Sequence, residues 1–126
     1  MAFDYPKVFF EERIWAISHP RPDRRSVATA ADLLRTAKSP LIIAGRGVRY
    51  SGAEGAVARF AAARGIPVVE TIVGKGGLTH YHPANAGPIG IIGSTRANTL
   101  AAGADVILAI GTRLQDFTTG SWTACA

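Results

Sequence analysis

Apolar residues occur along this chain in two patterns, as short unbroken runs and at every third or fourth position. The runs cover residues 41–44, 67–71 and 105–110. Continuous apolar runs of this length are typical of strands that are buried on both faces of a sheet. We therefore predict strands in these three ranges, and a short further strand near 89–92, where another apolar run follows a glycine-rich loop.

In the segments between the runs, the apolar residues have the spacing of one face of a helix. One helix is predicted over 24–37, with Asp23 as its N-cap, and another over 95–102, with Ser94 as its N-cap. The first of these should pack on the sheet through one apolar stripe, formed by Val27, Ala30, Ala31 and Leu34.

A further helix is predicted over 52–64, directly after the first strand. Ser51 and Glu54 have the spacing of a capping box, in which each side chain bonds a free backbone N–H at the helix start. Gly65 is placed to end this helix in a left-handed conformation. The turn before the helix contains Gly45 and Gly47, so we expect a tight turn there.

Strand, helix and strand follow each other at the length of a right-handed parallel crossover. The predicted fold class is therefore α/β, an open parallel sheet with helices on both faces, of the Rossmann-like type. The first strand in the sequence, at 41–44, should lie in the centre of the sheet, between the strand at 67–71 and the strand at 105–110. An antiparallel pairing of the first two strands would contradict this prediction.

The composition fits one globular domain, with 126 residues, 48% hydrophobic and 18% charged. Residues 1–22 lack the periodicity of a core element, and we interpret them as an interdomain arm that precedes an α/β domain at 23–126. The arm carries aromatic residues, and these need a surface to pack on, either on this domain or on a neighbouring one: Tyr5, Phe9, Phe10 and Trp15.

Charge and cysteine content bear on the binding partners and the cellular location to expect. The net charge is +5, but the arginines are scattered over different predicted elements and no nucleic-acid recognition motif accompanies them, so no nucleic-acid partner is expected. Cys125 is the only cysteine, which excludes a disulfide within the chain. No export signal or membrane-length apolar segment is present, and we expect a cytoplasmic protein without a membrane partner.

The first candidate site is the turn between the first strand and the helix that follows. Gly45, Arg46, Gly47 and Ser51 stand where a phosphate could bind at a helix N-terminus, although the glycine spacing departs from the dinucleotide fingerprint. Glu70 ends the next strand, where a ribose-binding acid would stand. The alternative is that the glycines only permit the turn and that Glu70 is solvated.

A second candidate group follows the strand at 105–110. Gly111, Thr112 and Arg113 should lie at the same carboxyl edge of the sheet, where ligands of open α/β folds bind, and Arg113 could hold a phosphate with two hydrogen bonds. The alternative role of Arg113 is an ion pair with Asp116 or with a neighbouring domain.

Metal binding and nucleophilic catalysis lack support in the sequence. His80 and His82 are two residues apart, but no third ligand of the right kind is evident, so no metal site is predicted. No serine stands in a nucleophile elbow and neither histidine has an orienting carboxylate at a readable spacing. We therefore predict no catalytic residue in this chain.

Four segments in a fixed order resemble the central domain of thiamine-diphosphate-dependent enzymes. They are Pro-Leu-Ile-Ile-Ala-Gly at 40–45, Gly-Ile-Pro-Val-Val-Glu-Thr at 65–71, Gly-Lys-Gly-Gly-Leu at 74–78 followed by His-Pro at 82–83, and Ala-Asp-Val-Ile-Leu-Ala-Ile-Gly-Thr-Arg at 104–113. The arm, the turn at 47–54 and the tail at 112–122 are most similar to a subgroup of carbon–carbon bond hydrolases that open trihydroxycyclohexane-1,2-dione in inositol breakdown. Arg46 and Thr79 depart from the usual pattern.

The resemblance implies an enzyme of which this chain is a part. In such enzymes, two other domains hold thiamine diphosphate and Mg²⁺, and their activating glutamate and Gly-Asp-Gly motif have no counterpart here. Some relatives bind FAD or ADP in the central domain. We therefore expect a chain that is inactive alone, that is truncated after Trp122, that contacts other domains of the parent enzyme and that forms homo-oligomers. The alternative is a free-standing Rossmann-type nucleotide-binding module.

Overall fold

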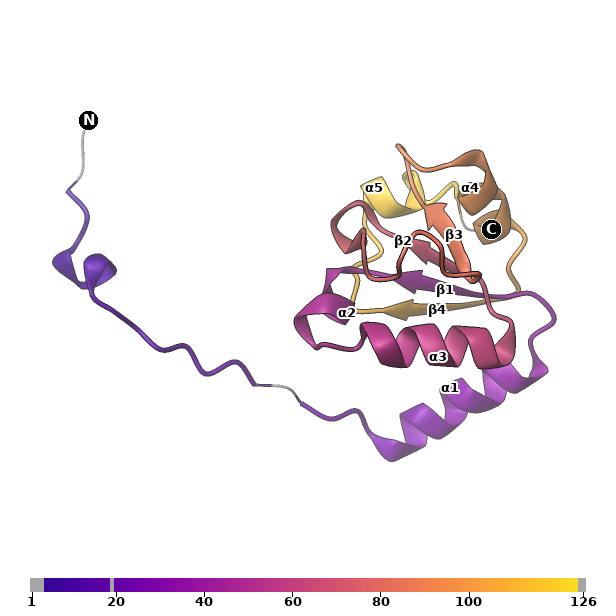
Figure 1. Cartoon of the computed structure of the whole chain (residues 1–126), viewed down its shortest axis with the longest axis horizontal. Coiled ribbons are helices and arrows are strands. Elements are labelled where there is room, and N and C mark those ends of the chain that lie inside the picture. Colours follow the sequence, from indigo (N-terminus) through magenta and orange to yellow (C-terminus); the bar gives the residue numbers. More distant parts are fainter. Residues whose placement is uncertain (1–3, 19, 125–126) are drawn as a thin grey trace.

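The computed structural model describes residues 4–18 and 20–124, so Cys125 lies outside the described residues. The chain folds into a small α/β domain with an extended N-terminal segment (Figure 1). In chain order its elements are η1 (Lys7–Phe10), α1 (Arg24–Thr36), β1 (Pro40–Ala44), α2 (Arg46–Tyr50), α3 (Glu54–Arg64), β2 (Val68–Glu70), η2 (Ile72–Gly74), β3 (Asn85–Pro88), α4 (Thr95–Ala102), β4 (Val106–Ile110) and α5 (Asp116–Thr119).

The four strands form one parallel sheet in the order β3-β2-β1-β4. Ile42 of β1 stands opposite Val68 of β2 on one side and opposite Leu108 of β4 on the other. The predicted α/β class and the central place of β1 are confirmed. Each connection returns the chain to the same end of the sheet, so that all three strand pairs are parallel.

Side chains of β1 alternate between two cores, one on each face of the sheet. Ile42 packs with Val57 and Ala61 of α3. The neighbouring Ile43 packs on the opposite face with a cluster that includes Ala97 of α4. All of these residues are buried, as expected for a parallel sheet that helices cover on both faces.

Three of the four predicted helix boundaries have the expected chemistry. The carboxylate of Asp23 accepts a 2.9 Å hydrogen bond from the N–H of Ser26, and the hydroxyl of Ser94 accepts one of 3.2 Å from the N–H of Ala97. Gly65 ends α3 at φ +65°. Side-chain caps and a left-handed glycine satisfy the backbone groups that a helix end leaves unpaired.

The predicted capping box at the start of α3 was wrong. Residues 46–50 form the short helix α2 instead of a bare turn, and the Ser51 hydroxyl donates back to the carbonyls of Gly47 and Val48, at 2.7 and 3.2 Å. Ser51 therefore closes α2, and α3 begins after Ala53 without a side-chain cap. The sequence pattern missed this because α2 is only one turn long.

The third strand lies at Asn85–Pro88, so the prediction of a strand near 89–92 was wrong. Gly90 has φ +105°, a conformation that ends an extended strand. Its N–H and C=O are bonded by the side chain of Asn98 at 2.9 and 3.0 Å. The apolar run at 89–92 is therefore split, with Ile89 buried in the core and Ile92 exposed.

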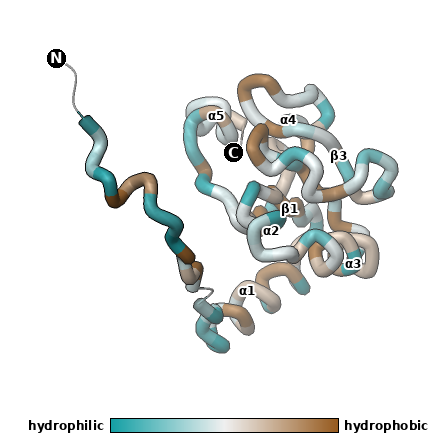
Figure 2. Tube along the Cα trace, turned by 60° about the vertical axis from the view of Figure 1, so that its left-hand side comes forward, coloured by the Kyte–Doolittle hydropathy of each residue, from teal (hydrophilic) through white to brown (hydrophobic). Residues whose placement is uncertain are grey.

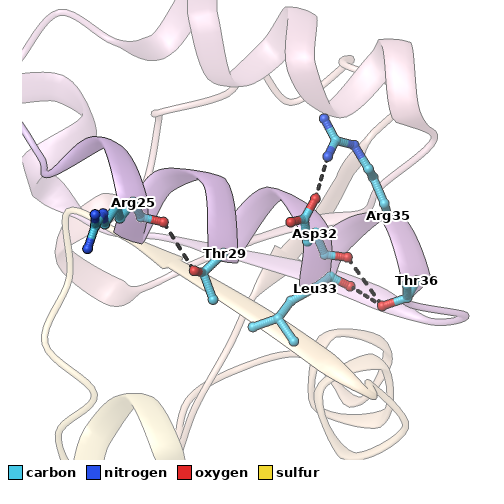
Figure 3. Close-up of polar contacts among 6 residues, drawn as sticks. All are labelled: Arg25, Thr29, Asp32, Leu33, Arg35 and Thr36. Atoms are coloured by element: carbon cyan, nitrogen blue, oxygen red, sulfur yellow. Dashed lines mark hydrogen bonds and ion pairs between the residues drawn. The ribbon is translucent and has the colours of Figure 1, made fainter.

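Helix α1 is only partly covered. Ala30, Ala31 and Leu34 are half-buried, whereas Val27 is 50% exposed, so the predicted stripe packs through part of its length. Figure 2 shows apolar and polar residues interleaved along α1. Polar side chains of α1 bond within the helix: the Thr29 hydroxyl donates to the Arg25 carbonyl at 3.1 Å, and Arg35 forms an ion pair with Asp32 (Figure 3).

The N-terminal segment extends away from the sheet (Figure 1). Phe10 and Trp15 are 78% and 74% exposed. The described part of the segment thus does not have its aromatic side chains buried on this domain, which was one of the two expectations, and packing on a neighbouring domain is the other. That contact, and the division into an arm at 1–22 and a domain at 23–126, stay predictions. None of the described helices has the length and apolar character that crossing a membrane requires.

Candidate functional site

The loops that follow β1 and β4 meet at the carboxyl edge of the sheet. The N–H of Gly45 donates to the carbonyl of Ile110, and the N–H of Gly47 donates to the carbonyl of Gly111, both at 2.9 Å. The structure therefore brings together the two predicted groups, the turn that begins at Gly45 and the loop of residues 111–113. Parallel strands place their carboxyl ends at one edge, which is why this contact could be predicted.

The glycines of this edge are needed for the contact between the two loops. A Cβ atom on Gly45 would lie 2.4 Å from both the carbonyl oxygen of Gly111 and the Cβ of Thr112, and one on Gly47 would lie 2.7 Å from the Cα of Gly111. Gly111 itself has φ +59°. The glycines therefore do more than permit a turn, because any side chain here would separate the loops.

Hydrogen bonds within the chain already use two of the N–H groups at the start of α2, those of Gly47 and Val48. Gly47 donates to Gly111, and Val48 donates to the carbonyl of Gly45 at 3.1 Å. A phosphate at a helix N-terminus depends on free N–H groups that point at it. Binding of an anion at this edge would therefore depend mainly on side chains.

Two arginines project from the same edge. Arg46 is exposed and lies over the Tyr50 ring, with its guanidinium carbon 5.0 Å from the ring centre. Arg113 is exposed as well. The ion pair between Arg113 and Asp116, one of its two alternative roles, is not formed, since the ion pair in the described part of the chain is the one in α1. Both arginines present positive charge outward.

Glu70 is buried at the end of β2, with 6% of its surface exposed, so the alternative of a solvated carboxylate was wrong. Its Oε1 atom accepts a 2.9 Å hydrogen bond from the N–H of Leu78. This bond fixes the glycine-rich loop after η2 to the end of the strand. A role of Glu70 in holding a ribose stays a prediction.

Ser51 lies apart from the two joined loops. It follows the last turn of α2, whereas Gly45 precedes the first, and its hydroxyl is occupied by the carbonyls of that helix. Of the predicted site residues, the structure therefore groups Gly45, Arg46 and Gly47 with the loop of residues 111–113.

Sequence reasoning missed a set of exposed apolar side chains at this edge. They follow β2, β3 and β4 and are 38–68% exposed: Ile72, Val73, Ile91, Ile92, Leu114 and Phe117. The loops are joined by a 3.0 Å hydrogen bond from the Ile91 N–H to the Phe117 carbonyl. Adjacent apolar residues in a loop directly after a strand were the signal available in the sequence. Exposed apolar groups of this kind mark a surface that another molecule covers.

A cleft of about 590 Å³ lies beside this edge, between α4 and the C-terminal segment. Its lining is largely polar or glycine and includes Gly90, Thr95, Asn98 and Thr123. The side chain of Asn98 is already bonded to Gly90, so it shapes the wall of the cleft. The cleft was not predicted, because its walls come from segments far apart in the sequence.

The described residues do not fit a thiamine diphosphate and metal site. No three His, Cys, Asp or Glu residues of the described ranges lie together as metal ligands. Glu70 is the buried carboxylate of the described residues, and its Oε1 atom accepts a hydrogen bond from the Leu78 N–H. His82 accepts a bond from the Ala84 N–H at 3.2 Å through Nδ1, while the His80 ring contacts the Tyr81 ring edge to face. The two histidines thus make separate local contacts.

Comparison with known proteins agrees with this arrangement. Residues 27–126 match the sequence profile of the family described as thiamine pyrophosphate enzyme, central domain. The chain belongs to this family. Membership in the central-domain family accounts for the parallel sheet and for the order of the loops at its carboxyl edge, and it implies thiamine diphosphate in the enzymes that contain such a domain.

Three relatives match this chain over almost its whole length. The 3D-(3,5/4)-trihydroxycyclohexane-1,2-dione hydrolase of Geobacillus thermodenitrificans is 46% identical over 120 residues. The proteins of the same name from Clostridium perfringens and Bacillus cereus are each 42% identical over 120 residues. Each match covers 95% of this chain, and the chain spans 19% of the length of each relative.

Proposed function

We propose that the chain is the central, structural domain of a thiamine-diphosphate-dependent hydrolase that opens trihydroxycyclohexane-1,2-dione in inositol breakdown. The observation that carries this proposal is the 46% identity over 120 residues to a hydrolase of that name. Identity at this level over nearly the whole chain supports the same role in the same kind of enzyme. A free-standing nucleotide-binding module is the less favoured alternative.

In this proposal the domain positions other parts of the enzyme and performs no step of the chemistry itself. Its buried carboxylate, Glu70, accepts a hydrogen bond from the Leu78 N–H and so holds a loop of the domain in place. Its exposed apolar groups at the carboxyl edge, and the aromatic residues of the N-terminal arm, provide surfaces for the remaining domains. The partners proposed are therefore other domains of the parent enzyme and further copies of it.

Thiamine diphosphate supplies the carbanion chemistry of such an enzyme, and we propose that it is held with Mg²⁺ by the other domains. The lack of a ligand cluster in the described chain supports this division of roles. The single cysteine, Cys125, fits a reducing compartment, and we propose a cytoplasmic location.

A nucleotide such as FAD or ADP, where one binds, is proposed to touch the carboxyl edge near Arg46 and Arg113. The exposed positive charge of the two guanidinium groups supports this place. Because the N–H groups of Gly47 and Val48 are occupied, we expect weak binding. Calorimetric titration with ADP, FAD and NAD tests this. Tight NAD binding that is lost in Glu70→Ala would favour the free-standing module.

The functional proposal is tested by exchange with the Geobacillus relative. Replacing its 120 matched residues by this chain should retain dione ring opening within about tenfold, because the fold and the edge contacts are kept. The isolated chain with thiamine diphosphate and Mg²⁺ should show no turnover. A matched chimera with Gly45→Val should lose activity, since the added side chain separates the two loops. Turnover by the isolated chain would overturn the proposal.

A further inference from the structure

A pocket of about 250 Å³ lies at the amino edge of the sheet, where β2 and β3 begin. Figure 1 shows the end of α3 and the start of β3 on one side of the domain, and α2 on the opposite side. The pocket is therefore separate from the candidate site at the carboxyl edge. Its lining residues are Ala61, Ala62, Gly65, Ile66, Pro67, Pro83, Ala84 and Arg96.

Small residues leave this pocket open. Ala61 and Ile66 are buried and form its floor, whereas Ala62 and Pro83 are exposed at its rim. Larger side chains at the alanine positions would fill the space between α3 and the start of β3, because protein interiors otherwise pack without such voids. The pocket is smaller than the roughly 300 Å³ at which sites for drug-sized ligands begin, so it suits a small molecule.

Backbone hydrogen bonds hold the walls of the pocket in place. The N–H of Ile66 donates to the carbonyl of Ala61 at 3.0 Å, and the N–H of Val68 donates to the carbonyl of Ala84 at 2.8 Å. The first bond ties the end of α3 to the start of β2, and the second ties β2 to the start of β3. A pre-formed pocket needs little ordering when a ligand binds, which favours affinity.

Arg96 is the one charged residue among those that line the pocket. It lies in the first turn of α4 and is exposed. The ion pair in the described part of the chain joins Arg35 and Asp32, so Arg96 has no carboxylate partner there. A guanidinium group binds a carboxylate through two parallel hydrogen bonds. The pocket thus combines apolar walls with one group that attracts an anion.

The backbone around the pocket favours a carboxylate over a phosphate. Pro67 and Pro83 have no N–H group, and the N–H groups of Ile66 and Ala84 already donate within the chain. A phosphate group carries more charge and more acceptor oxygens than a single arginine can satisfy, and leaving them unpaired is costly. A carboxylate has two oxygens, which match the two donors that one guanidinium presents.

We propose that this pocket binds a small monocarboxylate with a compact apolar body, such as benzoate. The apolar body lies against Ile66 and Ala84, and the carboxylate pairs with Arg96. Burial of the body supplies the favourable free energy, and the arginine fixes the orientation of the ligand. The ligand then contacts α3, α4 and the starts of β2 and β3 together.

Titration of the full 126-residue chain with benzoate, followed through the amide NMR spectrum, tests the proposal. We expect saturable shifts of the Gly65, Ile66 and Ala84 amides, with a dissociation constant of about 1 mM, which suits a ligand of so few atoms. Benzamide has the same ring without the charge. It should bind at least about tenfold more weakly, because it cannot form the charged pair with Arg96.

Two variants alter the pocket at exposed positions, where the fold tolerates them. Arg96→Gln removes the charge and Ala62→Leu fills the space at the rim, so each should raise the dissociation constant at least about tenfold. Arg59→Gln and Ala63→Leu are the matched controls. They make the same changes at exposed positions of α3 outside the pocket and should leave benzoate binding unchanged.

Several outcomes would overturn the proposal. One is the absence of saturable shifts at about 20 mM benzoate, well above the expected dissociation constant. Equal affinity for benzamide, or binding that either Arg96→Gln or Ala62→Leu leaves unchanged, would overturn it too. Shifts confined to Gly47 and Thr112 would place the anion at the carboxyl edge and so count equally against this pocket.

Discussion

The backbone N–H of Gly47 donates a 2.9 Å hydrogen bond to the carbonyl of Gly111 and so joins the loops that follow β1 and β4. Added side chains on either glycine would enter the other loop. The join sets the shape of the carboxyl edge, from which the exposed arginines and apolar side chains project.

Gly45→Ala should lower the free energy of unfolding by about 1–3 kcal/mol, because the new methyl group would lie 2.4 Å from atoms of the adjoining loop. Gly55→Ala is the control. Its methyl group would meet only the flexible end of Arg59 at 3.3 Å, so this helix substitution should stabilise by about 0.5–1 kcal/mol. Urea denaturation measures both, and equal effects would contradict the steric role of Gly45.

Glu70→Ala should lower the free energy of unfolding by about 1–3 kcal/mol, since it leaves the N–H of Leu78 without its acceptor in a buried place. Glu70→Gln should cost less, because the amide oxygen can still accept the bond. Urea denaturation measures the free energy of unfolding of both variants. Unchanged stability in Glu70→Ala would show that the bond is dispensable.

Asn98→Asp should destabilise the protein more than Asn98→Ala does at pH 7. The asparagine both accepts from and donates to the backbone of Gly90, whereas an ionised aspartate would bring a negative oxygen against the Gly90 carbonyl. The excess cost should shrink below about pH 4, where the carboxyl is protonated and can donate. Unfolding curves at several pH values check this, and a constant difference would be evidence against it.

Asp105 should make stability depend on acid pH. Backbone hydrogen bonds from Lys38, and next from Ser39, lower the pKa of its carboxyl below the ordinary value. The folded-state pKa is thus below that of the unfolded chain. The contribution to stability is present above the unfolded value, about 4, and is lost as pH falls through the folded value. Asp105→Asn should therefore give a shallower acid decline in urea midpoint, and parallel curves would refute this.

The sequence alone predicted β1, β2 and β4, their order in the sheet, and the helices α1, α3 and α4. The apolar runs of β1 and β4 predicted buried strands, and Asp23, Gly65 and Ser94 marked helix ends correctly. These features depend on neighbours within a few residues, so local patterns encode them. The apolar run at 89–92 was wrongly predicted as a strand, because its conformation depends on a residue outside the run, Asn98 of the next helix.

Only the tertiary structure decided how the carboxyl edge is used. Sequence reasoning placed Gly45 and Gly111 at one edge, but the close packing of their loops appears only when both strands are in register. Glu70 likewise obtained its partner, Leu78, from a loop whose path no local pattern defines. Burial and hydrogen bonding of such groups depend on which backbone segments the folded sheet brings together, and sequence periodicity carries no record of those distances.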